Sequence, residues 1–202
     1  MVKNSRVDRL KPALFVDRDG VINEDRGYNY VKRWEEFVFL DGVKETLAQV
    51  NSQGIPVVLI TNQSCIGKGL VSAETVAGIH QRVKEEIERA GGALAGVYVC
   101  PHTDEAECAC RKPRPGLLLQ AARDLQLDLR RSVFVGDSMR DMEAGRRAGV
   151  WTALVQSGKG AQQLELARES GLMPDFVCEQ FEDVLDVLTK VTNRPSGKPE
   201  SD

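Results

Sequence analysis

Short apolar runs alternate along this chain with segments of helical periodicity, and that alternation limits the fold more than any other feature of the sequence. The apolar runs predict strands over 13–16, 55–60, 96–99, 132–136 and 151–155, with a weaker strand over 175–178. Strands that alternate with helices are typical of a mostly parallel sheet with helices on both faces. The sequence therefore predicts a doubly wound α/β fold.

Helix signals lie between the predicted strands. Six helices are expected, after Asp41, Ser72, Pro115 and Ser138 and over roughly 161–169 and 181–191. Asp41 and Ser72 suit the N-cap position, where a side-chain oxygen accepts a hydrogen bond from a free main-chain N–H group. Ser138 and Asp141 resemble a capping box, and we interpret Asp141 mainly as a capping acid, with a place in a metal site as the alternative.

Length and composition limit the class of protein. The 202 residues are enough for one domain with a sizeable core, which we place over residues 1–192, and the polar residues 193–202 predict a disordered tail. A net charge of −3 argues against a general nucleic-acid surface. No apolar run approaches the roughly 20 residues that cross a membrane, and the first residues lack the apolar stretch of a signal peptide. We therefore expect a cytoplasmic protein without nucleic-acid or membrane partners.

Polar residues directly follow four of the predicted strands. In chain order these are Asp17 and Asp19, then Thr61, Asn62 and Gln63, then Cys100 and His102, and finally Asp137. Open α/β sheets bind ligands at the carboxyl ends of their strands. Four strand ends that bring such side chains to one edge of the sheet indicate a functional site there.

Asp17 and Asp137 are the expected carboxylate ligands of a magnesium ion, and the main-chain carbonyl of Asp19 is the expected third ligand. Mg²⁺ prefers oxygen ligands and keeps several of its waters, so three protein ligands suffice. The repulsion between Asp17 and Asp19 at the end of a buried strand also favours a bound cation. Asp17 can then attack phosphorus, while Asp19 donates a proton to the leaving oxygen and later accepts one from water.

A phosphoryl group in transfer also needs donors for its other oxygens. Thr61 offers a hydroxyl group, and Asn62 and Gln63 offer main-chain N–H groups. Lys112 offers a positive charge, and Arg111 offers a planar group that suits a second phosphate or sugar oxygens. We therefore expect these five residues to bind the phosphoryl group or the rest of the substrate.

Three cysteines and a histidine crowd into one short segment. Cys100, His102, Cys108 and Cys110 offer the four sulfur and nitrogen ligands that suit tetrahedral Zn²⁺. Four protein ligands leave no open position, so we expect a structural zinc ion that stabilises a polar loop. Free thiols or a disulfide are the alternatives. Zinc would also anchor the segment that carries Arg111 and Lys112.

Together these motifs resemble the haloacid dehalogenase superfamily of phosphohydrolases. Asp17-Arg18-Asp19-Gly20 matches its first motif, D-x-D-G, and Thr61, Lys112 and Gly136-Asp137 match its second, third and fourth. The resemblance implies the Rossmann-like fold of that superfamily, a phosphate ester of Asp17 as intermediate, and Asp19 as the acid and base. The segments after the first two motifs are too short for a large cap domain.

The cysteine-rich loop narrows the resemblance to a branch that contains heptose bisphosphate phosphatases and histidinol-phosphate phosphatases. Residues 23–28, 62–69 and 111–116 are similar to the heptose group, whereas the spacing between His102 and Cys108 is similar to the histidinol group. The resemblance implies removal of the 7-phosphate of D-glycero-D-manno-heptose 1,7-bisphosphate in lipopolysaccharide biosynthesis. We expect a monomer whose partner is a small phosphorylated sugar. Histidinol phosphate or another small sugar phosphate is the alternative substrate. A zinc-stabilised metal-binding module without catalysis is the alternative of another class.

Overall fold

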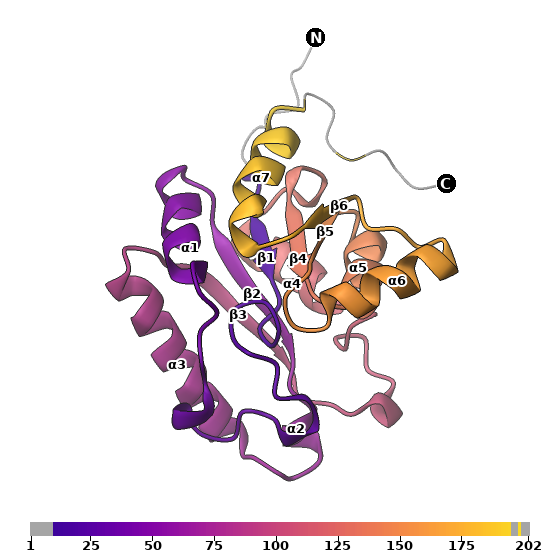
Figure 1. Cartoon of the computed structure of the whole chain (residues 1–202). Helices are drawn as coiled ribbons and strands as arrows, with labels where there is room; N and C mark the ends of the chain where they lie inside the picture. The colour runs from indigo at the N-terminus through magenta and orange to yellow at the C-terminus, as the bar shows by residue number, and fades with distance from the viewer. Residues whose placement is uncertain (1–9, 195–197, 199–202) are drawn as a thin grey trace.

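One parallel sheet organises the molecule. The computed structural model describes residues 10–194 and 198 (Figure 1). The strands are β1 (Leu14–Val16), β2 (Val57–Asn62), β3 (Leu94–Cys100), β4 (Val133–Gly136), β5 (Trp151–Val155) and β6 (Phe176–Cys178). They lie in the order β3-β2-β1-β4-β5-β6, and each neighbouring pair is parallel. The predicted doubly wound α/β fold is confirmed.

Helices cover both faces of this sheet. They are α1 (Val43–Ser52), α2 (Ser64–Gly67), α3 (Ala73–Arg89), α4 (Gly116–Leu125), α5 (Met139–Ala148), α6 (Gly160–Ser170) and α7 (Val184–Thr192). Short 3₁₀ helices lie at Gly27–Asn29, Trp34–Glu36, Asp104–Ala106, Leu129–Arg131 and Phe181–Asp183. Helices α1, α3 and α7 pack on one face, and α4 and α5 pack on the other (Figure 1).

Strand β1 shows why the predicted strands are continuously apolar. Leu14 and Val16 join the core beneath α1, α3 and α7, whereas Phe15 points to the opposite face and joins the core beneath α4 and α5. All three side chains are fully buried. Both faces of the strand are therefore dry, which requires an apolar residue at every position.

The helices predicted after Ser72, Pro115 and Ser138 begin directly after those residues. Helix α7 begins at Val184, after the 3₁₀ helix Phe181–Asp183, the sequence does not predict the short helix α2, and the start of α1 differs as well. Ser72 Oγ accepts a hydrogen bond from the N–H of Thr75 at 3.1 Å, as expected of an N-cap. The predicted cap at Asp41 is wrong, because the residue before α1 is Gly42, and no side chain caps it. Gly42 has φ of +72°, and a Cβ atom there would collide with the Glu182 carboxylate. Packing against a distant segment therefore sets this helix start.

The order of the strands reverses beside β1, which has β2 on one side and β4 on the other. Ligands of such sheets bind where the order reverses, at the carboxyl ends of the strands. The segments that follow β1 and β4 therefore meet at the place where the sequence predicts the site.

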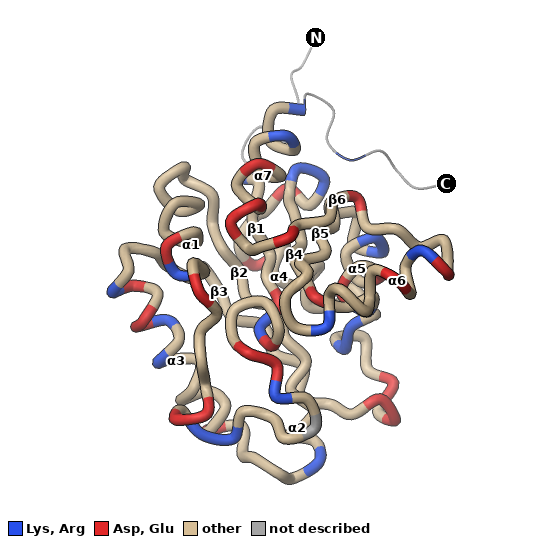
Figure 2. Tube along the Cα trace, in the orientation of Figure 1, with Lys and Arg blue, Asp and Glu red and all other residues tan. Residues whose placement is uncertain are grey.

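Other sequence predictions concern the surface and the chain ends. Basic and acidic residues are interspersed over the elements (Figure 2). No helix in the described part of the chain is long and apolar enough to span a bilayer. Most of the tail predicted over 193–202 lies outside the described residues. Lys198 is described, and its ammonium group lies 2.8 Å from the carbonyl oxygen of Val150 and 2.6 Å from Asp175.

Candidate active site

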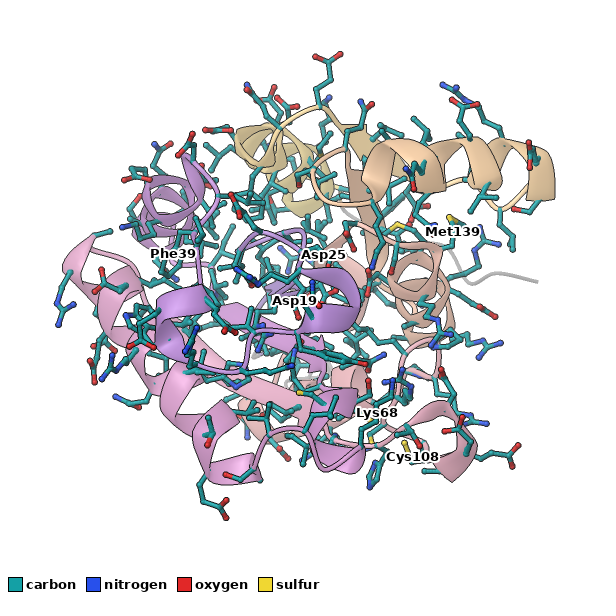
Figure 3. All side chains as sticks on the ribbon, turned by 60° about the horizontal axis from the view of Figure 1, so that its bottom comes forward. Asp19, Asp25, Phe39, Lys68, Cys108 and Met139 are labelled. Atoms are coloured by element: carbon teal, nitrogen blue, oxygen red, sulfur yellow. The ribbon has the colours of Figure 1, made fainter. Side chains whose placement is uncertain are left out.

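A cavity of about 310 Å³ lies at the carboxyl ends of the central strands. Seven of the residues predicted to form the site line it, namely Asp17, Asp19, Thr61, Asn62, Arg111, Lys112 and Asp137. Figure 3 looks onto this side of the molecule, where Asp19 and Asp25 lie near the middle and Lys68 and Cys108 lie to one side. The structure therefore brings together residues that are far apart in the chain.

Three carboxylates meet around one ammonium group in this cavity. Asp17, Asp137 and Asp141 each offer an oxygen within 4.8 Å of the others. Lys112 Nζ lies 2.7 Å from Asp17 Oδ1 and 2.7 Å from Asp141 Oδ1. When all are ionised, three negative charges and one positive charge leave an excess of two negative charges in a buried place. A divalent cation would balance that excess, and the oxygen donors suit Mg²⁺.

The electrostatics of the cluster support that fit. Burial raises the pKa of Asp17 to about 8, with repulsion from Asp141 and Asp137 adding to the rise and Lys112 opposing it. Burial, with repulsion from Asp141, also raises the pKa of Asp137 to about 7. The protein alone therefore supplies too little positive charge to keep both carboxylates ionised at low cost.

Gly20 allows the segments after β1 and β4 to come this close. It has φ of +84°, a conformation that a side chain disfavours, and a Cβ atom there would collide with Asp137 Oδ2. The same Oδ2 atom accepts a hydrogen bond from the N–H of Lys159 at 2.9 Å. The glycine of the D-x-D-G motif thus provides both the turn and the space for the Asp137 carboxylate.

Asp19 lies beside the cluster and is held by other partners. Arg18 Nη2 lies 2.8 Å from Oδ1 and 2.9 Å from Oδ2, while Asn23 Nδ2 and Gln63 Nε2 donate at 3.0 Å each. Burial acts to raise the pKa of Asp19, but the Arg18 guanidinium and these hydrogen bonds together lower it. This carboxylate is therefore ionised here, and the metal contact expected of the Asp19 main-chain carbonyl stays a prediction.

Thr61 and Gln63 form a connected pair. Thr61 Oγ1 accepts a hydrogen bond from Gln63 Nε2 at 2.9 Å, so its own O–H can donate to another group. The N–H of Gln63 donates to the carbonyl of Cys100 at 2.7 Å and is not available for the phosphate contact expected of it. Pairing between β2 and β3 causes this difference. The Gln63 side chain instead connects Thr61 to Asp19.

Asn62 fixes the position of Lys112. Its side chain accepts a hydrogen bond from the N–H of Lys112 and donates one to its carbonyl, each at 3.2 Å. The Lys112 ammonium also donates to the carbonyl of Ile60 at 3.1 Å. The expected contact between the Asn62 N–H and phosphate stays a prediction, whereas its side chain has a structural task that the sequence did not indicate.

Asp141 makes contacts that bear on both roles that the sequence left open, the capping acid and the metal ligand. Its Oδ2 atom accepts hydrogen bonds from the Ser138 N–H at 3.2 Å and the Ser138 hydroxyl at 2.6 Å, which confirms the capping box. Its Oδ1 atom faces Lys112 within the carboxylate cluster. The signal for the second role was its position one turn after Asp137, which places both acids at the same strand end.

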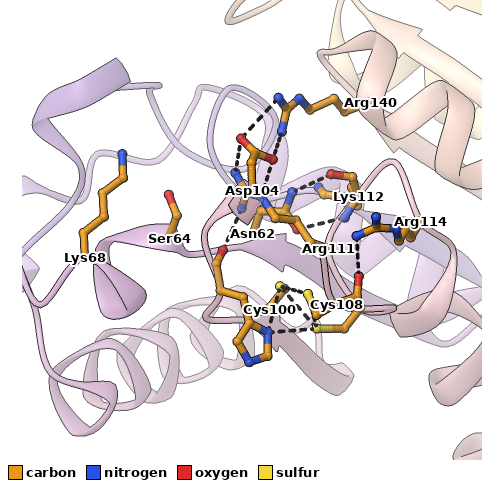
Figure 4. A network of polar contacts seen from close by, with 12 residues as sticks. Asn62, Ser64, Lys68, Cys100, Asp104, Cys108, Arg111, Lys112, Arg114 and Arg140 are labelled. Carbon is orange, nitrogen blue, oxygen red and sulfur yellow. Dashed lines mark hydrogen bonds and ion pairs between the residues drawn. The ribbon is translucent and has the colours of Figure 1, made fainter. Parts of the chain in front are cut away.

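The four predicted zinc ligands converge as well (Figure 4). The Sγ atoms of Cys100, Cys108 and Cys110 lie 3.2–3.6 Å apart. His102 Nδ1 lies 3.7 Å from Cys100 Sγ and 3.3 Å from Cys110 Sγ. Tetrahedral ligands of zinc stand roughly 3.5–3.8 Å apart, whereas disulfide sulfurs lie about 2 Å apart. The five cysteines carry no disulfide, so the donor set fits zinc.

Comparison with known proteins identifies relatives of this chain among phosphatases of the haloacid dehalogenase superfamily. A family model described as HAD-hydrolase-like matches residues 109–184. The D-glycero-beta-D-manno-heptose-1,7-bisphosphate 7-phosphatase of Pasteurella multocida is 41% identical over 182 residues and covers 87% of this chain and 95% of that protein. The enzyme of the same name from Vibrio cholerae is 39% identical and covers 90% and 98%. The crystal structure of the D,D-heptose 1,7-bisphosphate phosphatase of B. bronchiseptica, complexed with magnesium and phosphate, matches with a TM-score of 0.82 at 36% identity and covers 89% of this chain and 98% of that one.

Proposed function

This chain belongs to the heptose bisphosphate phosphatase family of haloacid dehalogenase-like hydrolases, and from that premise we propose that it removes the 7-phosphate of D-glycero-D-manno-heptose 1,7-bisphosphate. The observation that carries the proposal is the meeting of Asp17, Lys112, Asp137 and Asp141 in one cavity. This arrangement pairs a buried nucleophile with a fixed positive charge. Relatives of that name align with most of the chain.

Asp17 is the proposed nucleophile. The Lys112 ammonium pairs with Oδ1 and favours the ionised carboxylate, which leaves Oδ2 to attack phosphorus. The bond between Oδ2 and phosphorus forms as the bond between phosphorus and the sugar oxygen breaks. Lys112 and the free O–H of Thr61 stabilise the charge on the remaining phosphoryl oxygens.

Asp19 is the proposed acid and base. The leaving sugar oxygen takes a proton from Asp19, and Asp19 then takes a proton from the water that hydrolyses the phosphate ester of Asp17. The contacts from Arg18 and Gln63 hold this carboxylate ionised, which suits the second step. For the first step Asp19 must be protonated, so at least one of these contacts has to loosen when substrate binds.

Mg²⁺ and Zn²⁺ are the proposed metal ions. Asp17, Asp137 and the main-chain carbonyl of Asp19 would hold Mg²⁺, with Asp141 beside them. Bound Mg²⁺ would neutralise negative charge on the carboxylates and the phosphoryl group. A zinc ion would be held by the Cys-His cluster, Cys100, His102, Cys108 and Cys110, and would stabilise the loop. The magnesium and phosphate bound to the relative from B. bronchiseptica support the first assignment.

Phosphate release tests this proposal. We expect Mg²⁺-dependent release from the heptose bisphosphate, inhibition by EDTA, and a rate for Asp17→Asn below about 1% of wild type with an unchanged circular dichroism spectrum. Histidinol phosphate is assayed in parallel at the same concentration. A preference of about 10-fold for histidinol phosphate, equivalent to about 1.4 kcal/mol, would overturn the assigned substrate. Wild-type rates in Asp17→Asn would overturn the assigned nucleophile.

A further inference from the structure

Two arginines share one exposed carboxylate at the wall of the cavity. Asp104 Oδ1 lies 2.8 Å from Arg111 Nε and 2.8 Å from Arg140 Nη1. Its Oδ2 atom lies 3.5 Å from Arg111 Nη2 and 3.4 Å from Arg140 Nη2. Figure 4 shows the Asp104 carboxylate between the two guanidinium groups, which come from separate parts of the chain.

The two arginines come from elements that also build the reacting centre. Arg111 follows the Cys-His cluster, and its Nη1 atom donates to the carbonyl of His102 at 3.1 Å. Arg140 lies in the first turn of α5, next to Asp141. Both arginines line the same cavity as Asp17. An anion held between them would therefore belong to a molecule whose other end reaches Asp17.

Asp104 itself is easily displaced from this position. Its side chain is 57% exposed, and that of Arg140 is 51% exposed, so their ion pair competes with water and contributes little to stability. The Arg111 side chain is only 12% exposed and is fixed by its contact with His102. A phosphate offers three acceptor oxygens and more charge than one carboxylate, so it can satisfy both guanidinium groups better.

We propose that Arg140 and Arg111 form a subsite for the second phosphate of a bisphosphorylated sugar, and that the Asp104 carboxylate stands in for this phosphate when no substrate is bound. This inference rests on the proposed function, because it assumes a substrate with two phosphates. It makes Arg140 a residue that determines specificity, although it lies outside every motif that the sequence predicts to be functional. It also gives the cysteine-rich loop a part in binding, since that loop carries Asp104.

Competition against p-nitrophenyl phosphate tests the subsite. The inhibition constants of the heptose 1,7-bisphosphate and the heptose 7-phosphate are measured, and their ratio reports on the second phosphate alone. We expect wild type to favour the bisphosphate by about 10-fold or more, and Arg140→Gln to lose most of that preference. Asp104→Asn, which removes the competing charge, should lower the inhibition constant of the bisphosphate.

Arg168→Gln is the matched control. Arg168 is similarly exposed and pairs with Glu165 at 2.6 Å, but it lies on α6 away from the cavity lining. It should leave the ratio unchanged. Equal ratios in wild type and Arg140→Gln would overturn the subsite, and a purely structural ion pair would change thermal stability without changing this ratio. An unchanged or higher constant for Asp104→Asn would overturn the stand-in role. Phosphate release from the heptose bisphosphate is scored separately, so the proposed function and the subsite can fail independently.

Discussion

Lowering the pH should destabilise this fold through His80, because the folded chain holds that imidazole neutral. His80 lies on α3 and is 5% exposed. Its Nε2 atom lies 3.2 Å from Arg18 Nη1. Since a guanidinium group can only donate, Nε2 must accept and Nδ1 must carry the proton. A second proton on the ring would put two donors face to face beside a positive charge.

The size of the effect follows from the change in pKa on folding. Burial, with repulsion from Arg18, lowers the pKa of His80 from 6.5 to about 3. Between these values the unfolded chain binds a proton that the folded chain excludes, so the free energy of unfolding rises with pH. The contribution is complete above the unfolded pKa and is lost as the pH falls below it. Between about pH 7 and about pH 5 the loss is about 2 kcal/mol.

Urea unfolding of wild type and His80→Gln at about pH 7 and about pH 5 measures this contribution. Glutamine can still accept from Arg18 but does not titrate, and effects of pH on the metal sites and acidic groups cancel in the comparison. We expect wild type to lose about 2 kcal/mol more than His80→Gln between the two pH values. Equal losses in the two proteins would refute the buried neutral imidazole. His102, the only other histidine, is unchanged in both.

Two further predictions concern the metal sites. Lys112→Met leaves Asp17 and Asp141 without their buried partner, so it should lower the free energy of unfolding by about 3–5 kcal/mol in EDTA, and added Mg²⁺ should raise its melting temperature more than that of wild type. An equal Mg²⁺ effect in both proteins would contradict this. Cys108→Ser should lose bound zinc, measured by atomic absorption, and with it several degrees of melting temperature. Full zinc content in that variant would contradict the assigned ligand set.

Local patterns were sufficient to predict most of the fold. Buried strands such as β1 and β4 are unbroken apolar runs because helices cover both of their faces. Ser72 and Ser138 begin helices because their caps depend only on the next three residues. The start of α1 could not be predicted in this way. Gly42 is required there because Glu182, far along the chain, occupies the space of a side chain.

In the candidate site, too, local patterns predict some features, whereas contacts between distant segments decide others. Motif positions identify Asp17 and Asp137, because each directly follows a buried strand. Which groups remain free to bind substrate depends on contacts across the sheet, such as the bond between the N–H of Gln63 and Cys100 that removes an expected phosphate donor. The capping contacts of Asp141 with Ser138 are local, whereas its contact with the Lys112 ammonium joins two distant segments, which no local pattern indicates.

Lys112 connects the carboxylate cluster with the Cys-His cluster, the two sets of proposed metal ligands. A lysine fixed in one conformation loses about 1.5–2 kcal/mol of side-chain entropy, a cost that would otherwise arise during the reaction. In this protein the side-chain entropy of Lys112 is lost during folding. Asn62 bonds both main-chain groups of Lys112, Ile60 accepts from its ammonium, and Cys110 two residues earlier belongs to the Cys-His cluster. The loop therefore supplies Lys112 already in place, and loss of zinc is expected first to displace the ammonium group that lowers the pKa of Asp17.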